Sequence, residues 1–227
     1  MSSVKTVSYS PVQRMVFNHL LFNRISSLFR RTRHSPETSG KPVTKLNLGS
    51  GSRKLNGYCN IDVSSHADLQ LDLERESLPF PDESIDTVVC ISAINYFTRD
   101  RALEIIYDVF RVLKPGGVAR FAVQDLRKIA KKYVERDRDF FFQKLADGRE
   151  RFEGDTMADK FNAWFYGYRT SQGKHCKYFY DFESLALLFR KAGFVKIEEK
   201  KYRESRIPNI KDIDNRPEQM FFLEAVK

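Results

Sequence analysis

The 227-residue sequence lacks the patterns that mark several common protein classes. Its three cysteines are an odd number, lie far apart and include no CxxC pair, which argues against a disulfide framework or zinc knuckle and favours a reducing compartment. No apolar run approaches the roughly 20 residues that span a bilayer. No cluster of metal-ligating residues is readable either, so we expect any chemistry to be metal-free.

Two nucleotide-binding motifs are also missing. After the glycines at 49 and 51, a dinucleotide fingerprint would need a third glycine where the chain has Lys54. No Gly-Lys-Ser/Thr follows, which excludes a P-loop. The stretch ISAINYF at 91–97 has no Asn-Pro-Pro-aromatic motif of the kind that receives a flipped base, so no nucleic-acid partner is expected.

Acidic residues are absent from positions 1–36, where six lysines and arginines give +6 of the net charge of +9. The body of the chain is therefore close to balanced, which weakens a nucleic-acid interpretation of the basic composition. Within this segment the apolar residues of 17–29 fall on one face of a helix. This basic amphipathic helix could pack on the domain, lie on an anionic membrane surface, or be a cleaved transit peptide.

The stretch KLNLGSGSRKLNGYCNIDV, residues 45–63, organises the rest of the chain. A strand pattern runs into Gly49 and Gly51, and a second strand ends at Asp62, an arrangement that predicts a nucleoside-binding corner of an α/β sheet. The chain reaches Tyr58 within seven residues of Gly51, which is too short for a crossover helix. One sheet face should therefore be partly uncovered, and we expect the N-terminal helix to cover it.

Strand and helix patterns alternate along the remaining chain. Strands are predicted at 67–73, 87–91 and 118–123, helices at 99–113 and 182–192, and a closing strand pair at 194–202 and 220–226, joined by a long polar loop. The alternation predicts a doubly wound, mostly parallel sheet. Residues 1–41 form the N-terminal helix and linker, and 42–227 form the domain. Its aromatic-rich insertion at 126–180 is expected to be a substrate cap, although the aromatics could instead be only the core of that insertion.

Several motifs in a fixed order carry a family resemblance. LNLGSGS, NID, LDL with LPFPDESID, RVLKPGG and KAGF together resemble class I S-adenosylmethionine-dependent methyltransferases over residues 45–227. The resemblance implies a Rossmann-like, seven-stranded α/β sheet with an antiparallel last strand, and S-adenosylmethionine as cofactor. The QDLRKI segment and a histidine before the last helix resemble the branch associated with bacterial surface-polysaccharide and glycolipid synthesis.

The resemblance also implies where the cofactor binds. Gly49 and Gly51, flanked by Asn47 and Ser50, would approach its methionine part, and Asp62 would accept the ribose hydroxyls. The adenine would lie at Asp72 and Leu73, and Ser92 would line the methionine side. Three sites, covering four residues, depart from the family pattern. They are Asn47 in place of a common acid, Arg53 in place of a third glycine, and Asn95-Tyr96 in place of Glu-His.

We expect O-methylation of a sugar or another small-molecule hydroxyl, helped by a general base. The candidates are Asp125, which could instead be a helix N-cap, and His175, which could instead be a structural or exposed histidine. Tyr166 and Tyr168 are candidate acceptor contacts. The alternatives are a nucleic-acid methyltransferase and a non-catalytic cofactor-binding protein. We expect a cytoplasmic protein that can contact the inner face of the membrane through its N-terminal helix. The sequence carries no signal of oligomeric state.

Overall fold

The computed structural model describes residues 37–38, 41–167 and 173–227. The predicted N-terminal helix and Tyr168 lie outside the described residues. The chain divides after His34, and the description below concerns the second unit, residues 35–227. Within the described ranges, no helix has the length and apolar character needed to cross a bilayer.

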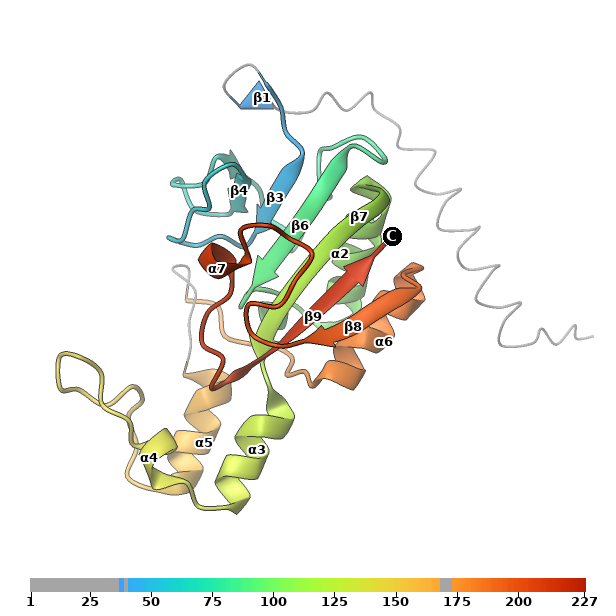
Figure 1. Cartoon of the computed structure of the whole chain (residues 1–227). Helices are drawn as coiled ribbons and strands as arrows, with labels where there is room; N and C mark the ends of the chain where they lie inside the picture. Colours follow the sequence, from blue (N-terminus) through green and yellow to red (C-terminus); the bar gives the residue numbers. More distant parts are fainter. Residues whose placement is uncertain (1–36, 39–40, 168–172) are drawn as a thin grey trace, which may run out of the picture. The chain divides into compact units, whose positions relative to one another are not determined.

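The second unit is built on a seven-stranded sheet (Figure 1). In spatial order its strands are β5 (Leu69–Gln70), β4 (Cys59–Asp62), β3 (Lys45–Leu48), β6 (Ile85–Ile91), β7 (Leu113–Gln124), β9 (Met220–Val226) and β8 (Lys196–Lys200). The first five strands run parallel, and β9 runs antiparallel to both β7 and β8. This arrangement confirms the predicted α/β fold with an antiparallel last strand. A short hairpin, β1 (Glu37–Thr38) and β2 (Lys41–Pro42), precedes the sheet.

Seven helical segments connect or extend these strands in the described part of the chain. They are η1 (Ile94–Tyr96), α2 (Arg99–Val112), α3 (Leu126–Val134), α4 (Arg138–Phe141), α5 (Met157–Tyr166), α6 (Phe182–Ala192) and α7 (Ile210–Ile213). α6 has the predicted bounds because Asp181 caps its start and Gly193, in a left-handed conformation, ends it. α2 ends one residue early, and the Lys-Pro-Gly-Gly turn that follows forms an irregularity inside β7.

The third predicted strand, 67–73, is much shorter in the structure. β5 contains only two residues, paired with Ile61 and Asp62. On its N-terminal side the Asp68 carboxylate, rather than the backbone, accepts the Asn60 amide. On its C-terminal side the chain turns, because the amides of Arg75 and Glu76 donate to the Asp72 carbonyl. Side-chain capping and a turn therefore limit this edge strand.

The two faces of the sheet are covered by different kinds of structure. Neighbouring residues of a strand point to opposite faces, and in β6 Val88 packs into the cluster that includes α2 and α6, whereas Val89 packs against Ile207, Ile210 and Ile213. Accordingly, α2 and α6 lie on one side of the sheet and α7 on the other (Figure 1). We call residues 201–219, which join β8 to β9 and include α7, the β8–β9 connection.

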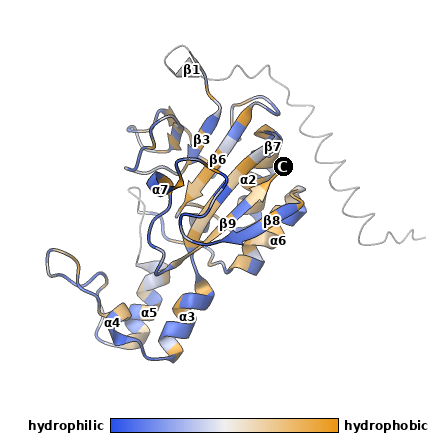
Figure 2. Ribbon diagram, in the orientation of Figure 1, coloured by the Kyte–Doolittle hydropathy of each residue, from blue (hydrophilic) through white to orange (hydrophobic). Residues whose placement is uncertain are grey.

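No helix separates β3 from β4, which confirms the prediction drawn from the short spacing after Gly51. Among the described residues, the β8–β9 connection covers the sheet face left open there. The prediction of a long polar loop is therefore incomplete: the connection is mostly hydrophilic (Figure 2), yet it buries Ile207, Ile210 and Ile213 against β6. The expected cover by the N-terminal helix lies outside the described residues.

A buried charge network anchors the β8–β9 connection to the sheet. Arg120 of β7 is fully buried and binds the Asp214 carboxylate through two nitrogens, at 3.2 and 2.6 Å. Glu224 of β9 lies 3.8 Å from the same guanidinium and accepts hydrogen bonds from Ser205 and Arg206. Arg120 thus compensates two buried acids, and Arg206, whose side chain is 37% exposed, adds a second positive charge beside Glu224.

Helices α3, α4 and α5 build a separate small core within the predicted insertion. The buried residues of this core are Ile129, Phe141, Phe152, Trp164 and Phe165. Phe140 stacks on Trp164 with ring centroids 4.6 Å apart, and Lys160 is buried against Glu150 and the Phe152 carbonyl. Many of the aromatics that suggested a substrate cap are therefore occupied in holding the insertion together.

Candidate functional site

The glycine loop after β3 adopts a backbone that requires its glycines. Gly49 and Gly51 have φ values of +62° and +54°, a left-handed conformation that side chains disfavour. A Cβ on Gly49 would also come within 2.3 Å of the Ala93 Cβ, whereas one on Gly51 would meet nothing within 4 Å. Gly49 therefore allows close packing against the end of β6, and Gly51 leaves space for a ligand.

Hydrogen bonds from the Asn47 side chain stabilise this loop, which stands where a helix would otherwise follow β3. The buried side-chain amide of Asn47 donates to the Arg53 carbonyl at 3.1 Å and to the Asn60 Oδ1 at 2.8 Å. A carboxylate at this position has no N–H to donate to the Arg53 carbonyl or to the Asn60 Oδ1. This explains why the chain departs from the family pattern here. Asn60 extends the network to Asp68, which also binds Lys54. Partial burial raises the pKa of Asp68, but the hydrogen bonds from Lys54 and Asn60 outweigh it and set the pKa below its ordinary value.

Arg53 connects the glycine loop to the β8–β9 connection. Its guanidinium donates to the backbone carbonyls of Ile213 at 2.8 Å and Asp212 at 2.5 Å. A third glycine could not make this contact, so the second departure from the family pattern also has a structural reason. The loop and the connection are joined directly across the sheet edge.

Asp62, at the end of β4, faces the glycine loop as predicted. Its Oδ2 accepts the Gly51 amide at 3.0 Å and its Oδ1 accepts the Ser64 amide at 2.9 Å. One hydrogen bond on each oxygen leaves further acceptor capacity on a half-buried carboxylate. Asp72 and the buried Leu73 follow the neighbouring strand β5, so both lie farther along the same edge.

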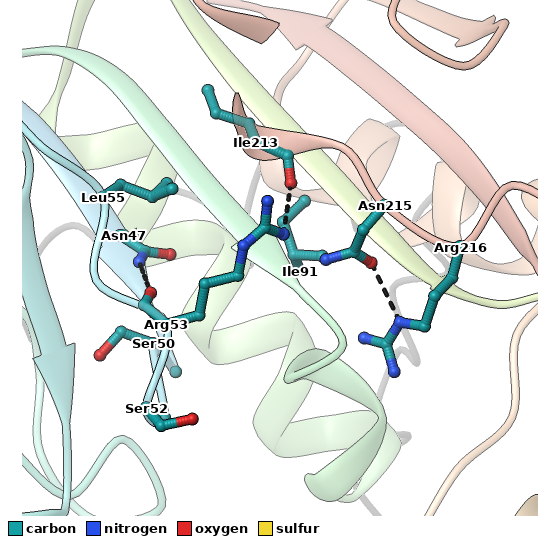
Figure 3. Close-up of a pocket in the computed structure, with 11 residues that line it drawn as sticks. Asn47, Ser50, Ser52, Arg53, Leu55, Ile91, Ile213, Asn215 and Arg216 are labelled. Carbon is teal, nitrogen blue, oxygen red and sulfur yellow. Dashed lines mark hydrogen bonds between the residues drawn. The ribbon is translucent and has the colours of Figure 1, made fainter. Parts of the chain in front are cut away.

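A cavity of about 210 Å³ lies beside the glycine loop (Figure 3). One wall contains Asn47, Gly49, Ser50 and Gly51, and the opposite wall contains Ile213, Asn215 and Arg216 of the β8–β9 connection. The buried Ser50 hydroxyl has no hydrogen-bond partner, so it can bind a polar group inside the cavity. Sequence reasoning missed Asn215 and Arg216 because they lie more than 160 residues from the glycines and belong to no recognisable motif.

Ser92, after β6, is linked to the far wall of this cavity. Its hydroxyl accepts a hydrogen bond from the Arg216 guanidinium at 2.8 Å. Ser92 and Arg216 both have positive φ values, +58° and +50°, which is costly for residues with side chains. The structure thus holds two strained residues together at the predicted methionine side of the site.

The two candidate bases have different environments. Asp125 caps α3, because its Oδ1 accepts the amides of Arg127 at 3.0 Å and Lys128 at 3.2 Å. His175 is exposed, and its Nδ1 lies 2.7 Å from the Tyr166 carbonyl. A carbonyl can only accept, so Nδ1 carries the proton in this contact and the Nε2 lone pair is available as a base. Tyr166 is itself 56% exposed, with its ring against Phe179.

The segment that carries His175 lies beside the predicted adenine region. Lys177 binds Glu74 at 2.5 Å, and Lys174 lies 3.6 Å from Glu74 and 3.9 Å from Asp72. The Lys177 amide donates to the Asn95 carbonyl at 2.8 Å, which ties the segment to the end of β6. His175 is therefore held between two loops at the carboxyl edge of the sheet, where a cofactor and an acceptor would meet.

The three cysteines are buried, and none forms a disulfide. Burial raises the pKa of the Cys90 thiol to about 12, and burial with the nearby Asp68 charge raises that of Cys59 to about 11. Burial also raises the pKa of Cys176. All three thiols remain protonated near neutral pH, so none is a candidate nucleophile.

Comparisons with known proteins agree on one class of domain. Residues 40–121 match the family model described as "Methyltransferase domain". The matched range includes the glycine loop, Asp62, Asp72 and Ser92, and the described His175 and Arg216 lie beyond it. Methyltransferase class and S-adenosylmethionine as cofactor are thus supported for the part of the chain that carries the predicted cofactor residues.

Curated relatives match only part of the chain. Phthiotriol/phenolphthiotriol dimycocerosates methyltransferase of Mycobacterium tuberculosis is 31% identical over 121 residues, which cover 44% of this chain and 43% of that protein. The Mycobacterium bovis protein of the same name matches to the same extent. The chain thus matches less than half the length of these relatives.

Solved structures resemble a larger share of the chain at lower identity. A SAM-dependent methyltransferase from Archaeoglobus fulgidus is 12% identical, with a TM-score of 0.48, over 92% of this chain and 94% of that one. An S-adenosylmethionine-dependent methyltransferase from Mesorhizobium loti is 15% identical, with a TM-score of 0.45, over 82% of this chain and 91% of that one.

Proposed function

We propose that this chain transfers a methyl group from S-adenosylmethionine to a hydroxyl of a sugar or another small molecule, without a metal ion. The observation that carries the proposal is the corner formed by the glycine loop and Asp62. An open Gly51 and a carboxylate at the end of the next parallel strand form a nucleoside site, and both lie within the matched methyltransferase domain.

The residues at this corner fit the cofactor. Asp62 retains acceptor capacity for two ribose hydroxyls, and Asp72 and the buried Leu73 follow the neighbouring strand on the proposed adenine side. The partnerless hydroxyl of Ser50 and the polar wall of the cavity beside it suit the amino-acid part. Each region of the corner thus matches a different chemical part of S-adenosylmethionine.

S-adenosylmethionine, when bound, supplies a methyl group that is already activated by its sulfonium. The chain's task is to hold the acceptor in line with that methyl, and such positioning can contribute roughly 7–11 kcal/mol. We propose that the described part of the insertion and the segment at 173–177 hold the acceptor and exclude water from it. Tyr166, exposed beside that segment, is a proposed acceptor contact.

A hydroxyl acceptor benefits from a base that takes its proton. We assign this role to His175, whose Nε2 lone pair is made available by the Nδ1 contact with the Tyr166 carbonyl. Asp125 is the weaker candidate, because the amides of α3 already engage its Oδ1. In this assignment Asp125 mainly fixes the start of α3.

The acceptor class is the part of the proposal that depends most on likeness. The resemblance to the surface-polysaccharide branch favours a glycan or glycolipid, and the mycobacterial relatives are named for triol derivatives, which are also hydroxyl compounds. Three unpaired cysteines are compatible with the proposed cytoplasmic location. Contact with the membrane through residues 1–36 remains part of the proposal.

Transfer of a radiolabelled methyl group to a panel of acceptors tests this function. The panel should contain sugar nucleotides, glycolipids, a long-chain triol and an oligonucleotide. We expect label in one of the hydroxyl acceptors and a loss of about 10²–10⁴-fold in His175→Ala. Binding of S-adenosylhomocysteine should persist in that variant, and His66→Ala, which changes another exposed histidine, should retain full activity.

Each other outcome identifies a different error. Unchanged turnover in His175→Ala would remove His175 as the base. Label in the oligonucleotide would make the protein a nucleic-acid methyltransferase. Cofactor binding without transfer to any acceptor would favour a non-catalytic cofactor-binding protein.

A further inference from the structure

The cavity beside the glycine loop has a positive side formed by a segment that the sequence did not implicate. Arg216 lies in the wall contributed by the β8–β9 connection, opposite the glycines (Figure 3). Arg53 borders the same cavity from the side of the glycine loop, and its guanidinium donates to the carbonyls of Asp212 and Ile213. None of the described residues that line the cavity is acidic. The cavity therefore favours an anionic group, and Arg216 is the side chain placed to bind it.

The position of Arg216 is held by its neighbours at a cost in backbone strain. Its Nε donates to the Asn215 side chain at 3.0 Å, and one terminal nitrogen donates to Ser92 at 2.8 Å. Both Arg216 and Ser92 have positive φ values. Strained residues persist where the surrounding structure enforces them, and such positions cluster at ligand sites. The guanidinium is thus oriented before any ligand arrives.

The order of the strands indicates which part of the cofactor reaches this cavity. Along the sheet edge the sequence of strands is β5, β4, β3 and β6. Asp62 ends β4, so a ribose bound there has the end of β5 on one side and the glycine loop, followed by the end of β6, on the other. On the β5 side, Asp72 and Glu74 already lie in ion pairs with lysines of the segment at 173–177. The β6 side carries Ser92 and Arg216, and Arg216 borders the cavity.

We propose that Arg216 binds the α-carboxylate of the methionine part of S-adenosylmethionine, so that the β8–β9 connection supplies the cofactor's amino-acid subsite. This inference rests on the proposed function. An arginine is suited to a carboxylate because its guanidinium carries a fixed positive charge and several N–H donors. The Ser50 hydroxyl, buried in the same cavity without a partner, provides a second polar contact for the same part of the cofactor.

The β8–β9 connection takes the place of the helix that is absent between β3 and β4. The chain between β3 and β4 is too short to contain a helix after the glycine loop. The β8–β9 connection covers the sheet face that this helix would have covered. Arg53 ties the two segments together. The β8–β9 connection, which covers the sheet face in place of the missing helix, therefore also completes the cofactor site.

Calorimetric titration with two ligands isolates the proposed contact. S-adenosylhomocysteine carries the amino-acid part, and 5′-methylthioadenosine keeps the adenosine but lacks the carboxylate and the amine. In Arg216→Gln we expect the affinity for S-adenosylhomocysteine to fall about 10–100-fold, while the affinity for 5′-methylthioadenosine stays within about twofold. Arg216→Lys, which keeps the charge without the fork, should give an intermediate loss.

Arg203→Gln is the matched control. Arg203 also has a positive φ and belongs to the same connection, but its guanidinium lies over the Tyr202 ring and does not line the cavity. Its affinity for both ligands should equal that of the unmodified protein. Thermal unfolding of each variant checks that the connection remains folded.

Two results would overturn the inference. Equal losses for both ligands in Arg216→Gln would mean that Arg216 supports the site without contacting the carboxylate, and no loss for either would mean that it is not part of the site. Failure of the unmodified protein to bind either ligand is a separate result, because it would refute the proposed function and the inference together.

Discussion

The two faces of the sheet are buried by different kinds of structure. α2 and α6 cover one face with apolar helix surfaces, and residues such as Leu188 and Phe189 are completely buried there. The other face is covered by the β8–β9 connection, which buries three isoleucines and an ionic network around Arg120. The face covered by helices is stabilised mainly by hydrophobic packing, whereas the face covered by the connection also depends on ion pairs between particular side chains. Only the connection also contributes to the candidate cofactor cavity.

The largest expected effect comes from breaking the network on the connection face. Arg120→Met would leave Asp214 and Glu224 buried without their shared partner, and we expect a loss of about 3–5 kcal/mol in the free energy of unfolding. Urea denaturation measures this loss. Arg149→Met removes an ion pair of similar length, 2.7 Å to Asp147, from an exposed site and should cost less than about 1 kcal/mol. Similar losses of stability in the two variants would contradict the claim that the buried network contributes more than an exposed ion pair.

A pair of matched truncations sharpens the comparison. Ile213 on the connection face and Leu188 on the helical face are both fully buried, so Ile213→Ala and Leu188→Ala should each cost about 2–5 kcal/mol. Only Ile213→Ala should also weaken binding of S-adenosylhomocysteine, because Ile213 borders the cavity. Denaturation and calorimetry on both variants provide the test. Equal weakening of binding would mean that the site senses overall stability rather than the connection.

A smaller effect is expected where the missing helix is replaced by hydrogen bonds. Asn47→Asp removes two amide hydrogen bonds, to the Arg53 carbonyl and to Asn60, and should cost about 1–3 kcal/mol. Asn162→Asp is the control, since the Asn162 amide bonds a carbonyl on an exposed helix face. If thermal denaturation shows equal stability for Asn47→Asp and the unmodified protein, the loop does not depend on this amide.

The smallest effect concerns pH. The pKa of Asp68 is lowered in the folded chain, so its contribution to stability is complete above the unfolded value of about 3.9 and is lost as the pH falls through the lower folded value. Asp68→Asn removes this contribution at all pH values. The stability difference between the unmodified protein and Asp68→Asn, measured by urea denaturation, should therefore shrink as the pH falls below about 4. A difference that is constant with pH would contradict this role of the carboxylate.

Much of the fold was predictable from local patterns. The strands around the glycine loop, α6 with its terminal Gly193 and the closing antiparallel pair follow from periodicity and capping residues that are visible in the sequence. The loss of the first crossover helix also followed from a simple length argument. These features depend on residues that are close together in the chain.

The remaining features depend on distant partners. Arg120 looks like an ordinary strand residue until Asp214 and Glu224 are brought to it by tertiary folding. Arg216 shows no motif, because its role comes from lying opposite a loop that is far away in the sequence. The predicted cofactor residues could be named from their place after parallel strands, but the wall that faces them could not.

Hydrogen–deuterium exchange with and without S-adenosylhomocysteine is the most direct test of the central claim, which is that the glycine loop and the β8–β9 connection form one cofactor site. The account predicts slower exchange on ligand addition at both 49–53 and 213–216, with α2 and α6 unchanged. Slower exchange at neither segment, or at 49–53 alone, would contradict it.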